Sequence, residues 1–159
     1  MQENKKENKK GFTLIEILLV IGIIAVLATV VIVALDPAKR FADARDSRRL
    51  SDIESILSAV QQSIVDNKGV LPSGIDTIER HIGTAGSGCA LATDVCAVGG
   101  DGDCVDLSGS LAKYLKSMPS DPANGSASLT HYAIVADANN LITVKACDST
   151  DPTISAVSR

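Results

Sequence analysis

The sequence predicts an α+β fold, in which a long N-terminal α-helix precedes a small head with antiparallel β-structure. Three patterns predict it: an uncharged apolar run from Ile17 to Leu35, a helical stripe of apolar residues from Leu50 to Ile64, and two β-rich runs near the C-terminus. A helix of roughly 20 apolar residues crosses the ~30 Å hydrocarbon core of a bilayer. The first pattern therefore predicts a membrane-spanning helix and the second an amphipathic one.

The junction between the two helical stretches reads Leu35-Asp36-Pro37-Ala38. Asp36 is a favourable N-cap and Pro37 suits the first turn of a helix, so a new helix can begin here. Pro37 can equally kink one continuous helix, because proline removes a backbone hydrogen bond. The helical period then continues to Asn67-Lys68-Gly69, where the glycine is a C-terminal stop signal.

Two short helices are predicted in the first part of the head. The run Asp76-Thr77-Ile78-Glu79 has the pattern of a capping box, which predicts a helix of one to two turns that ends near Gly83. Asp106 is placed to cap a second short helix, whose inward-facing residues are Leu107, Leu111, Tyr114 and Leu115.

The end of the chain is predicted to contain a β-hairpin. Residues 131–136 and 141–146 are rich in strand-forming residues, and the polar sequence Asp137-Ala138-Asn139-Asn140 joins them. The tail from Ser149 is polar, and we expect it to be frayed.

All four cysteines, Cys89, Cys96, Cys104 and Cys147, lie after the apolar run. In an exported head they are expected to form two disulfides, for which three connectivities exist. A zinc site is the alternative, but no C-x-x-C pair occurs and both histidines are remote from the cluster. We expect Cys89–Cys96 to close a short local loop and Cys104–Cys147 to tie the end of the sheet to the segment before Leu107.

Few residues suggest a metal site or catalysis. Asp101, Asp103 and Asp106 are weak candidates for calcium ligands, because the run lacks the 12-residue order and the bidentate glutamate of an EF-hand. A solvated acidic turn is the favoured interpretation. No cofactor is expected, and no nucleophile–base pair, phosphate loop or paired-carboxylate site emerges, so we do not expect an enzyme.

The residues that open the apolar run are unusual in two ways. The sequence reads Lys9-Lys10-Gly11-Phe12-Thr13-Leu14-Ile15-Glu16, which places a carboxylate inside the apolar stretch, where it needs a partner. The small residue Gly11 also precedes the apolar run, whereas a secretory signal has its cut site after it. The lysines before Gly11 are predicted to stay in the cytoplasm, so a cut after Gly11 leaves the helix in the protein.

Gly11 to Glu16, G-F-T-L-I-E, resembles the N-terminus of type IV prepilins. The resemblance implies that a prepilin peptidase cuts between Gly11 and Phe12, that the new α-amine of Phe12 is methylated, and that Glu16 sets subunit register by pairing with the Phe12 amine of a neighbouring subunit. A plain membrane anchor that is never cut is one alternative, and a Glu16 that snorkels to the membrane interface is another. Many members have a proline inside the apolar half, whereas here the first proline is Pro37.

The resemblance also implies the domain organisation. Residues 1–11 are a cleaved cytoplasmic leader, and residues 12–35 are the transmembrane and polymerisation helix. Residues 36–68 are the amphipathic half of that helix, which packs on a small antiparallel β-sheet in this family. Residues 69–159 are the disulfide-stabilised globular head.

The mature chain is expected to be acidic. The whole chain has a net charge of −4, and removal of residues 1–11 leaves 11 basic against 17 acidic residues and a net charge of −6. Direct binding of nucleic acid is therefore not expected. One basic cluster is interleaved with carboxylates, a pattern typical of a solvated helix face, and consists of Lys39, Arg40, Arg45, Arg48 and Arg49 with Asp36, Asp43, Asp46 and Asp52.

The expected function is that of a structural pilin subunit. It forms a homopolymer, a type IV pilus-like surface filament for adhesion, motility or DNA uptake. Its expected partners are prepilin peptidase and an inner-membrane assembly platform with its ATPase. Before assembly it is a single-pass inner-membrane protein with its head outside the cytoplasm, and afterwards part of an extracellular filament. The alternatives are a major pseudopilin of a type II secretion system and a membrane-anchored binding domain that never polymerises.

Overall fold

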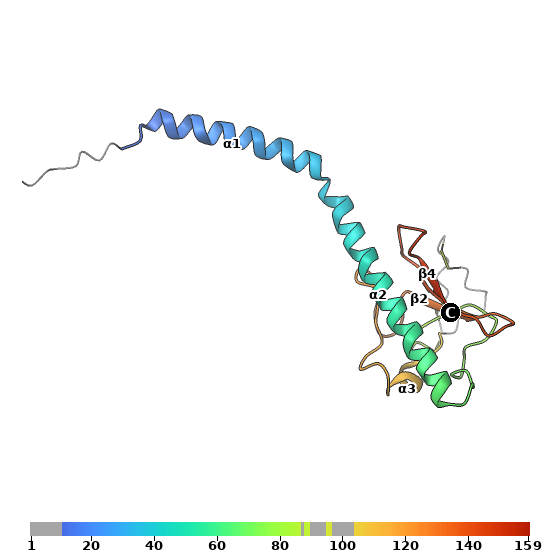
Figure 1. Ribbon diagram of the computed structural model, residues 1–159. Helices are drawn as coiled ribbons and strands as arrows, with labels where there is room; N and C mark the ends of the chain where they lie inside the picture. Colours follow the sequence, from blue (N-terminus) through green and yellow to red (C-terminus); the bar gives the residue numbers. More distant parts are fainter. Residues whose placement is uncertain (1–10, 87, 90–94, 97–103) are drawn as a thin grey trace, which may run out of the picture. The chain divides into compact units, whose positions relative to one another are not determined.

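The computed structural model describes residues 11–86, 88–89, 95–96 and 104–159 (Figure 1). The chain divides into two compact units, Met1–Arg40 and Phe41–Arg159. The first unit contains an apolar helix, and the second contains most of a second helix together with a small antiparallel sheet. The predicted α+β class is confirmed.

A break at Asp36 separates the first two helices. Helix α1 (Leu14–Leu35) ends at Asp36, whose backbone is left-handed with φ 38° and ψ 76°. Helix α2 (Pro37–Asp66) begins at the next residue. The Asp36 carboxylate accepts a hydrogen bond from the Lys39 N–H at 3.4 Å, and its carbonyl accepts one from the Arg40 N–H at 3.3 Å. Of the two alternatives for this junction, the structure therefore shows a new helix that Asp36 caps.

Helix α2 ends where the glycine signal predicts. The backbone becomes left-handed at Lys68 (φ 59°) and Gly69 (φ 90°). The Gly69 N–H donates a hydrogen bond to the Ile64 carbonyl at 2.8 Å. This bond satisfies one of the carbonyls that every helix leaves unpaired at its C-terminal end.

The head contains a four-stranded antiparallel sheet with the order β1-β2-β3-β4. The predicted hairpin forms its centre, as β2 (Tyr132–Ala136) and β3 (Ile142–Ala146). Strand β1 (Arg80–His81) pairs with β2, and β4 (Ala156–Ser158) pairs with β3. A one-turn helix, α3 (Ser108–Leu111), follows Asp106, whose carboxylate accepts a hydrogen bond from the Ser108 N–H at 2.9 Å.

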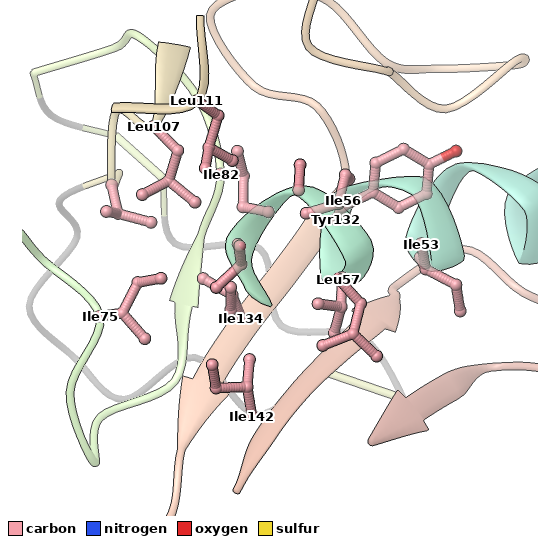
Figure 2. Close-up of a cluster of buried hydrophobic side chains, with 14 of the residues drawn as sticks. Ile53, Ile56, Leu57, Ile75, Ile82, Leu107, Leu111, Tyr132, Ile134 and Ile142 are labelled. Carbon is pink, nitrogen blue, oxygen red and sulfur yellow. The ribbon is translucent and has the colours of Figure 1, made fainter. Parts of the chain in front are cut away.

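The main core lies between α2 and one face of this sheet (Figure 2). Ile53, Ile56 and Leu57 of α2 pack with Tyr132 and other side chains of the central strands, and all are at most 2% exposed. Burial of each such aliphatic side chain contributes about 1.5–3 kcal/mol. The helical stripe of the sequence is therefore the face of α2 that covers the sheet. The labelled members of the core are Ile53, Ile56, Leu57, Ile75, Ile82, Leu107, Leu111, Tyr132, Ile134 and Ile142.

The helix predicted from Asp76 to near Gly83 is absent, and that prediction was wrong. The Asp76 carboxylate accepts a hydrogen bond from the Ile78 N–H at 2.9 Å, two residues on, which closes a local turn rather than a helix. The Asp76 carbonyl accepts another from the Ala136 N–H at 2.9 Å. Arg80 is then free to pair with Ile134 in the sheet. The long-range pairing of β1 outweighs the local capping pattern.

The tail is not simply frayed, because part of it forms the edge strand β4. Ile142 and Arg159 exchange two backbone hydrogen bonds at 3.0 Å, and the Ala146 N–H donates to the Ser155 carbonyl at 2.7 Å. The expectation of a frayed tail was wrong for these residues. Three paired residues with only one sizeable apolar side chain, Val157, give little sequence signal for a strand.

Arg49 is not on a solvated face, which corrects the interpretation of the basic cluster. Its side chain is 5% exposed and forms ion pairs with Asp46, at 2.7 Å, and with Asp121. Asp46 also accepts hydrogen bonds from the N–H and hydroxyl of Thr150. These buried groups, called here the Arg49 network, join α2 to two distant loops. Arg40, Arg45 and Arg48 are exposed, as expected of a solvated face.

The disulfides join Cys89 to Cys104 and Cys96 to Cys147, so the expected pairing was wrong. The sheet explains the difference. Val105 follows Cys104 and pairs with Ile82 on the outer side of β1, whereas Cys147 follows β3. Three strand spacings of about 4.8 Å separate these positions, roughly 14 Å in all, and a disulfide needs Cα atoms within about 7 Å. The observed Cα–Cα distances are 5.3 and 5.2 Å.

Candidate functional site

Helix α1 exposes its apolar side chains on every side, and none of its residues is buried. It has 22 residues, and by length and composition it is the one described helix that is able to cross a membrane. Exposed apolar surface on this scale marks contact with lipid or with other protein chains. This helix and the residues just before it are therefore the candidate functional site.

The start of α1 is a closed capping box formed by Thr13 and Glu16. Thr13 is the N-cap residue, and its hydroxyl oxygen accepts a hydrogen bond from the Glu16 N–H at 3.3 Å. The Glu16 atom Oε2 accepts hydrogen bonds from both the N–H and the hydroxyl of Thr13, each at 2.8 Å. Two orphan donors at the helix start are satisfied in this way.

The capping box holds the Glu16 carboxylate at the N-terminal end of α1, and this end of a helix carries a partial positive charge. Glu16 lies in the first turn, where the helix dipole favours a negative charge. Among the described residues no hydrogen bond reaches its other oxygen, Oε1. The carboxylate is thus able to keep its bonds to Thr13 and accept a further donor at the same time.

The interpretation of the sequence missed the role of Thr13. Glu16 is predicted there to pair with an amine or to snorkel to the membrane interface, although Thr13-Leu14-Ile15-Glu16 also has the S/T-x-x-E pattern of a capping box. That pattern was sufficient to find the contact, because both partners lie within one helical turn.

Gly11 and Phe12 lie immediately before this box and are exposed, and the Phe12 residue is 85% exposed. Neither residue is part of a helix, because α1 begins only at Leu14. The peptide bond between them therefore lies in an exposed segment just before α1.

The other predicted site residues are the calcium-ligand candidates and the four cysteines. Asp101 and Asp103 lie outside the described residues, and the Asp106 carboxylate bonds to the backbone of α3. In the part of the chain that the structure describes, no group of three or more metal-ligating side chains is close enough to hold an ion. The four cysteines are all consumed in the two disulfides.

Comparison with known proteins supports the importance of the N-terminal segment. Residues 6–32 match the family model described as the prokaryotic N-terminal methylation motif. The match includes Gly11, Phe12 and the whole Thr13–Glu16 capping box. A search of curated proteins found no match to the chain, and a search of solved structures found none either.

Proposed function

Because the chain carries the N-terminal methylation motif, the class III signal of type IV pilins and pseudopilins, we propose that it is the structural subunit of a type IV pilus-like filament. The motif implies processing by prepilin peptidase followed by assembly. The observation that carries the proposal is the match over residues 6–32. The matched segment includes most of α1, which buries none of its own apolar side chains.

The exposed apolar side chains of α1 are suited to contact first lipid and then protein. Before assembly, the 22 residues of Leu14–Leu35 are covered by the hydrocarbon core of the inner membrane, which they are long enough to cross. After cleavage, the same side chains pack against the helices of neighbouring subunits. Removal of the lysine-rich residues before Phe12 also removes the charges that hold this end at the cytoplasmic surface.

Glu16 sets the register of the subunits in this proposal. Cleavage after Gly11 creates a new cation, the α-amine of Phe12, which the Glu16 carboxylate of an adjacent subunit accepts through Oε1. Thr13 meanwhile keeps Oε2 in place. A buried charge without its partner is strongly unfavourable, so only the register that pairs every amine with a carboxylate is stable.

The head remains outside the cytoplasm in both states. Its two disulfides support this placement, because such bonds form and persist in oxidising compartments. The lysines before Gly11 support it as well, since positively charged flanks stay on the cytoplasmic side.

The decisive experiment combines mass and imaging. The full chain is expressed in cells with an active prepilin peptidase, and the intact mass of the membrane-extracted protein is measured. We expect a protein that begins at Phe12 and carries one added methyl group. Electron microscopy of fibres sheared from these cells should show filaments that contain it.

Three other outcomes contradict parts of the proposal. A mature protein that still begins at Met1 excludes prepilin processing. A processed protein found only in short periplasmic fibres of a secretion system identifies a pseudopilin instead. A processed protein that never forms fibres identifies a membrane-anchored binding domain.

A further inference from the structure

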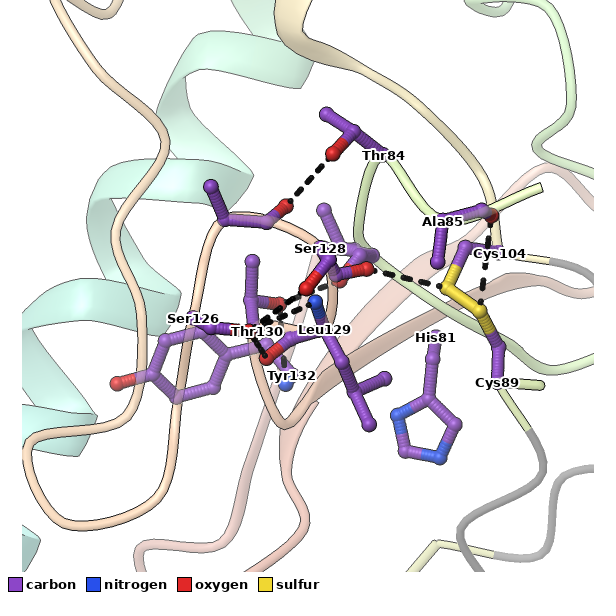
Figure 3. The surroundings of a disulfide bond; sticks show 12 residues. His81, Thr84, Ala85, Cys89, Cys104, Ser126, Ser128, Leu129, Thr130 and Tyr132 are labelled. Atoms are coloured by element: carbon purple, nitrogen blue, oxygen red, sulfur yellow. Dashed lines mark hydrogen bonds between the residues drawn. A yellow bond between two sulfur atoms is a disulfide. The ribbon is translucent and has the colours of Figure 1, made fainter. Parts of the chain in front are cut away.

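The two disulfides of the head lie in opposite chemical surroundings. The sulfur of Cys104 is 3.6 Å from the carbonyl oxygen of Ser128, and the sulfur of Cys89 is 3.8 Å from that of Ala85 (Figure 3). A carbonyl oxygen is the negative end of a dipole, so it disfavours a thiolate at either position. In the reduced chain, such neighbours favour the thiol form of a cysteine.

Cys147 instead faces a histidine. Its sulfur is 3.6 Å from Nδ1 of His81, and both residues are at most 2% exposed. Their partners on this side of the sheet are Cys96 and Ala133, which are also fully buried. An imidazole within hydrogen-bond reach of a cysteine favours the thiolate, which is the reactive form in disulfide exchange.

We propose that His81 is the base that activates Cys147 when the Cys96–Cys147 disulfide forms. The Cys96 thiol first loses its proton, and the thiolate attacks an external disulfide, that of glutathione disulfide or of an exported thiol oxidase. The external S–S bond breaks, one of its sulfurs leaves and takes up a proton as a thiol, and the other stays bonded to Cys96 in a mixed disulfide. His81 takes the proton from the Cys147 thiol, and the Cys147 thiolate attacks the sulfur of Cys96. The Cys96–Cys147 bond forms, the bond to the external sulfur breaks, and that sulfur leaves as a thiolate, which then takes up a proton.

This activation operates only after the sheet has formed. His81 is opposite Ala133 in the β1–β2 pair, and Ala133 is opposite Lys145 in the β2–β3 pair. The Cys147 N–H donates to the His131 carbonyl at 3.0 Å, which continues the β2–β3 register. His81 and Cys147 therefore meet through three aligned strands, and Cys147 gains its base when these strands pair.

Activation of Cys147 by the paired sheet affects which cysteine pairs form. In an unfolded chain the Cys96–Cys147 loop, with a sequence separation of 51, competes with a Cys89–Cys96 loop of seven. Loop closure favours the shorter loop by about 20-fold if its probability falls as the 3/2 power of length. A nucleophile that is activated only in the paired sheet favours the long native bond over the short incorrect one.

The other charged groups near His81 have partners of their own. On the same face of the sheet, the Lys145 ammonium forms an ion pair with Glu79 at 2.7 Å. After Cys147, the Asp148 carboxylate is bound by His131 at 3.0 Å and by the Asn124 amide at 2.7 Å. Among the described residues, His81 is the titratable group that contacts the Cys147 sulfur.

The first test leaves His81 unchanged and measures thiol ionisation in the full chain in detergent. The Cys96→Ser variant leaves Cys147 as a free thiol beside His81, and the Cys89→Ser variant leaves Cys104 beside the Ser128 carbonyl. Ultraviolet absorbance of the thiolate is followed against pH, and the corresponding double variants without either cysteine of the pair serve as blanks. At neutral pH, we expect the thiolate fraction of Cys147 to be at least about tenfold larger than that of Cys104. This ratio corresponds to titration midpoints that differ by about one pH unit. Equal or weaker ionisation of Cys147 overturns the proposal.

The second test measures disulfide formation. The reduced full chain is refolded with glutathione disulfide, quenched with acid at intervals, and mapped for each cysteine pair. His81→Gln should slow Cys96–Cys147 formation about tenfold, the thiolate difference expected above, and increase the Cys89–Cys96 pair. The rate constant for Cys89–Cys104, corrected for the Cys89 lost to that pair, should stay unchanged. Equal rates for Cys96–Cys147 with and without His81 overturn the proposal. If His81→Gln does not fold, the ionisation measurement alone decides.

Discussion

In the unit Met1–Arg40 the side chains of α1 all face outward, whereas in the unit Phe41–Arg159 side chains from α2, α3 and the sheet close around one core. The key contact of the first unit joins residues three positions apart, Thr13 and Glu16. The key contacts of the second, those of the Arg49 network, join residues 72 and 104 positions apart. The first unit thus holds a local pattern and leaves its apolar side chains uncovered, whereas the second covers its core through its own long-range contacts.

The largest expected effect comes from Glu16→Ala. Filament yield should fall to near zero while the amount of protein in the membrane is unchanged or increases, because removal of a carboxylate makes the span more apolar. The loss affects the addition of every subunit, because each Phe12 amine is then buried without its partner. The measurement is the yield of sheared fibres relative to the membrane pool.

Two further variants make the Glu16 experiment specific. Glu16→Gln keeps the size and hydrogen bonding of the side chain without its charge, and should give an intermediate yield at best. Glu54→Ala removes an exposed carboxylate from α2 and should assemble normally. Normal filament yield from Glu16→Ala, in cells without wild-type subunits, would show that this carboxylate does not set register.

The next largest effect is expected from Arg49→Met, which leaves α1 unchanged and lowers the stability of the head. Removal of one partner from a buried ion pair costs about 3–5 kcal/mol, because Asp46 and Asp121 remain buried without their cation. Urea unfolding followed by the near-ultraviolet circular dichroism of the tyrosines measures this loss. Arg45→Met, at an exposed position on the same helix, should change stability by less than about 0.5 kcal/mol. Similar stabilities for the two variants would contradict a role for the Arg49 network.

The contacts of Glu16 and Arg49 differ in how far the sequence predicts them. The capping pattern of Thr13 and Glu16, the stop at Gly69 and the β2–β3 hairpin are set by neighbours in the chain, so they are visible in the sequence. Arg49 looks like any surface arginine, because its partner Asp121 becomes a neighbour only in the folded head. The disulfide pairing failed for the same reason, since it depends on the strand order. Nearness in the chain favoured the incorrect Cys89–Cys96 pair, which left Cys104 for Cys147.

Acid should destabilise the head through the Arg49 network. Burial alone would raise the pKa of Asp46, but hydrogen bonds from Thr150 and Arg49 outweigh it and hold this pKa below the ordinary value. Burial likewise opposes the lowered pKa of Asp121, which the Arg49 side chain and two backbone N–H groups stabilise. A carboxyl group with a lowered pKa contributes its full stability above its unfolded pKa of about 3.9 and loses it as the pH falls through the folded value.

The stability of the head should therefore vary little with these groups above about pH 5 and fall below about pH 4. Urea midpoints measured from pH 7 to pH 2 test this expectation. In Arg49→Met the acid-induced loss of stability should be smaller, because without the cation the folded pKa values of both carboxyls move back up towards the unfolded value. An acid profile that is identical with and without Arg49 would locate the acid-sensitive carboxyls elsewhere.

The smallest effect, expected from Thr13→Ala, distinguishes the capping role of this residue from the register role that we propose for Glu16. Loss of a threonine N-cap costs about 0.5–2 kcal/mol, and the cost should be confined to the first turn of α1. Amide hydrogen exchange in detergent should become faster at Glu16 and Ile17, whose N–H groups bond to the hydroxyl and the carbonyl of Thr13. Thr13→Ser keeps the hydroxyl and should retain most of the protection. Because Thr13→Ala leaves the charge of Glu16 in place, it should reduce filament yield less than Glu16→Ala does, and the urea midpoint of the head should not change. Unchanged exchange at Glu16 would mean that the capping box does not persist in the membrane-inserted subunit, and a yield as low as that of Glu16→Ala would make Thr13 part of the assembly contact itself.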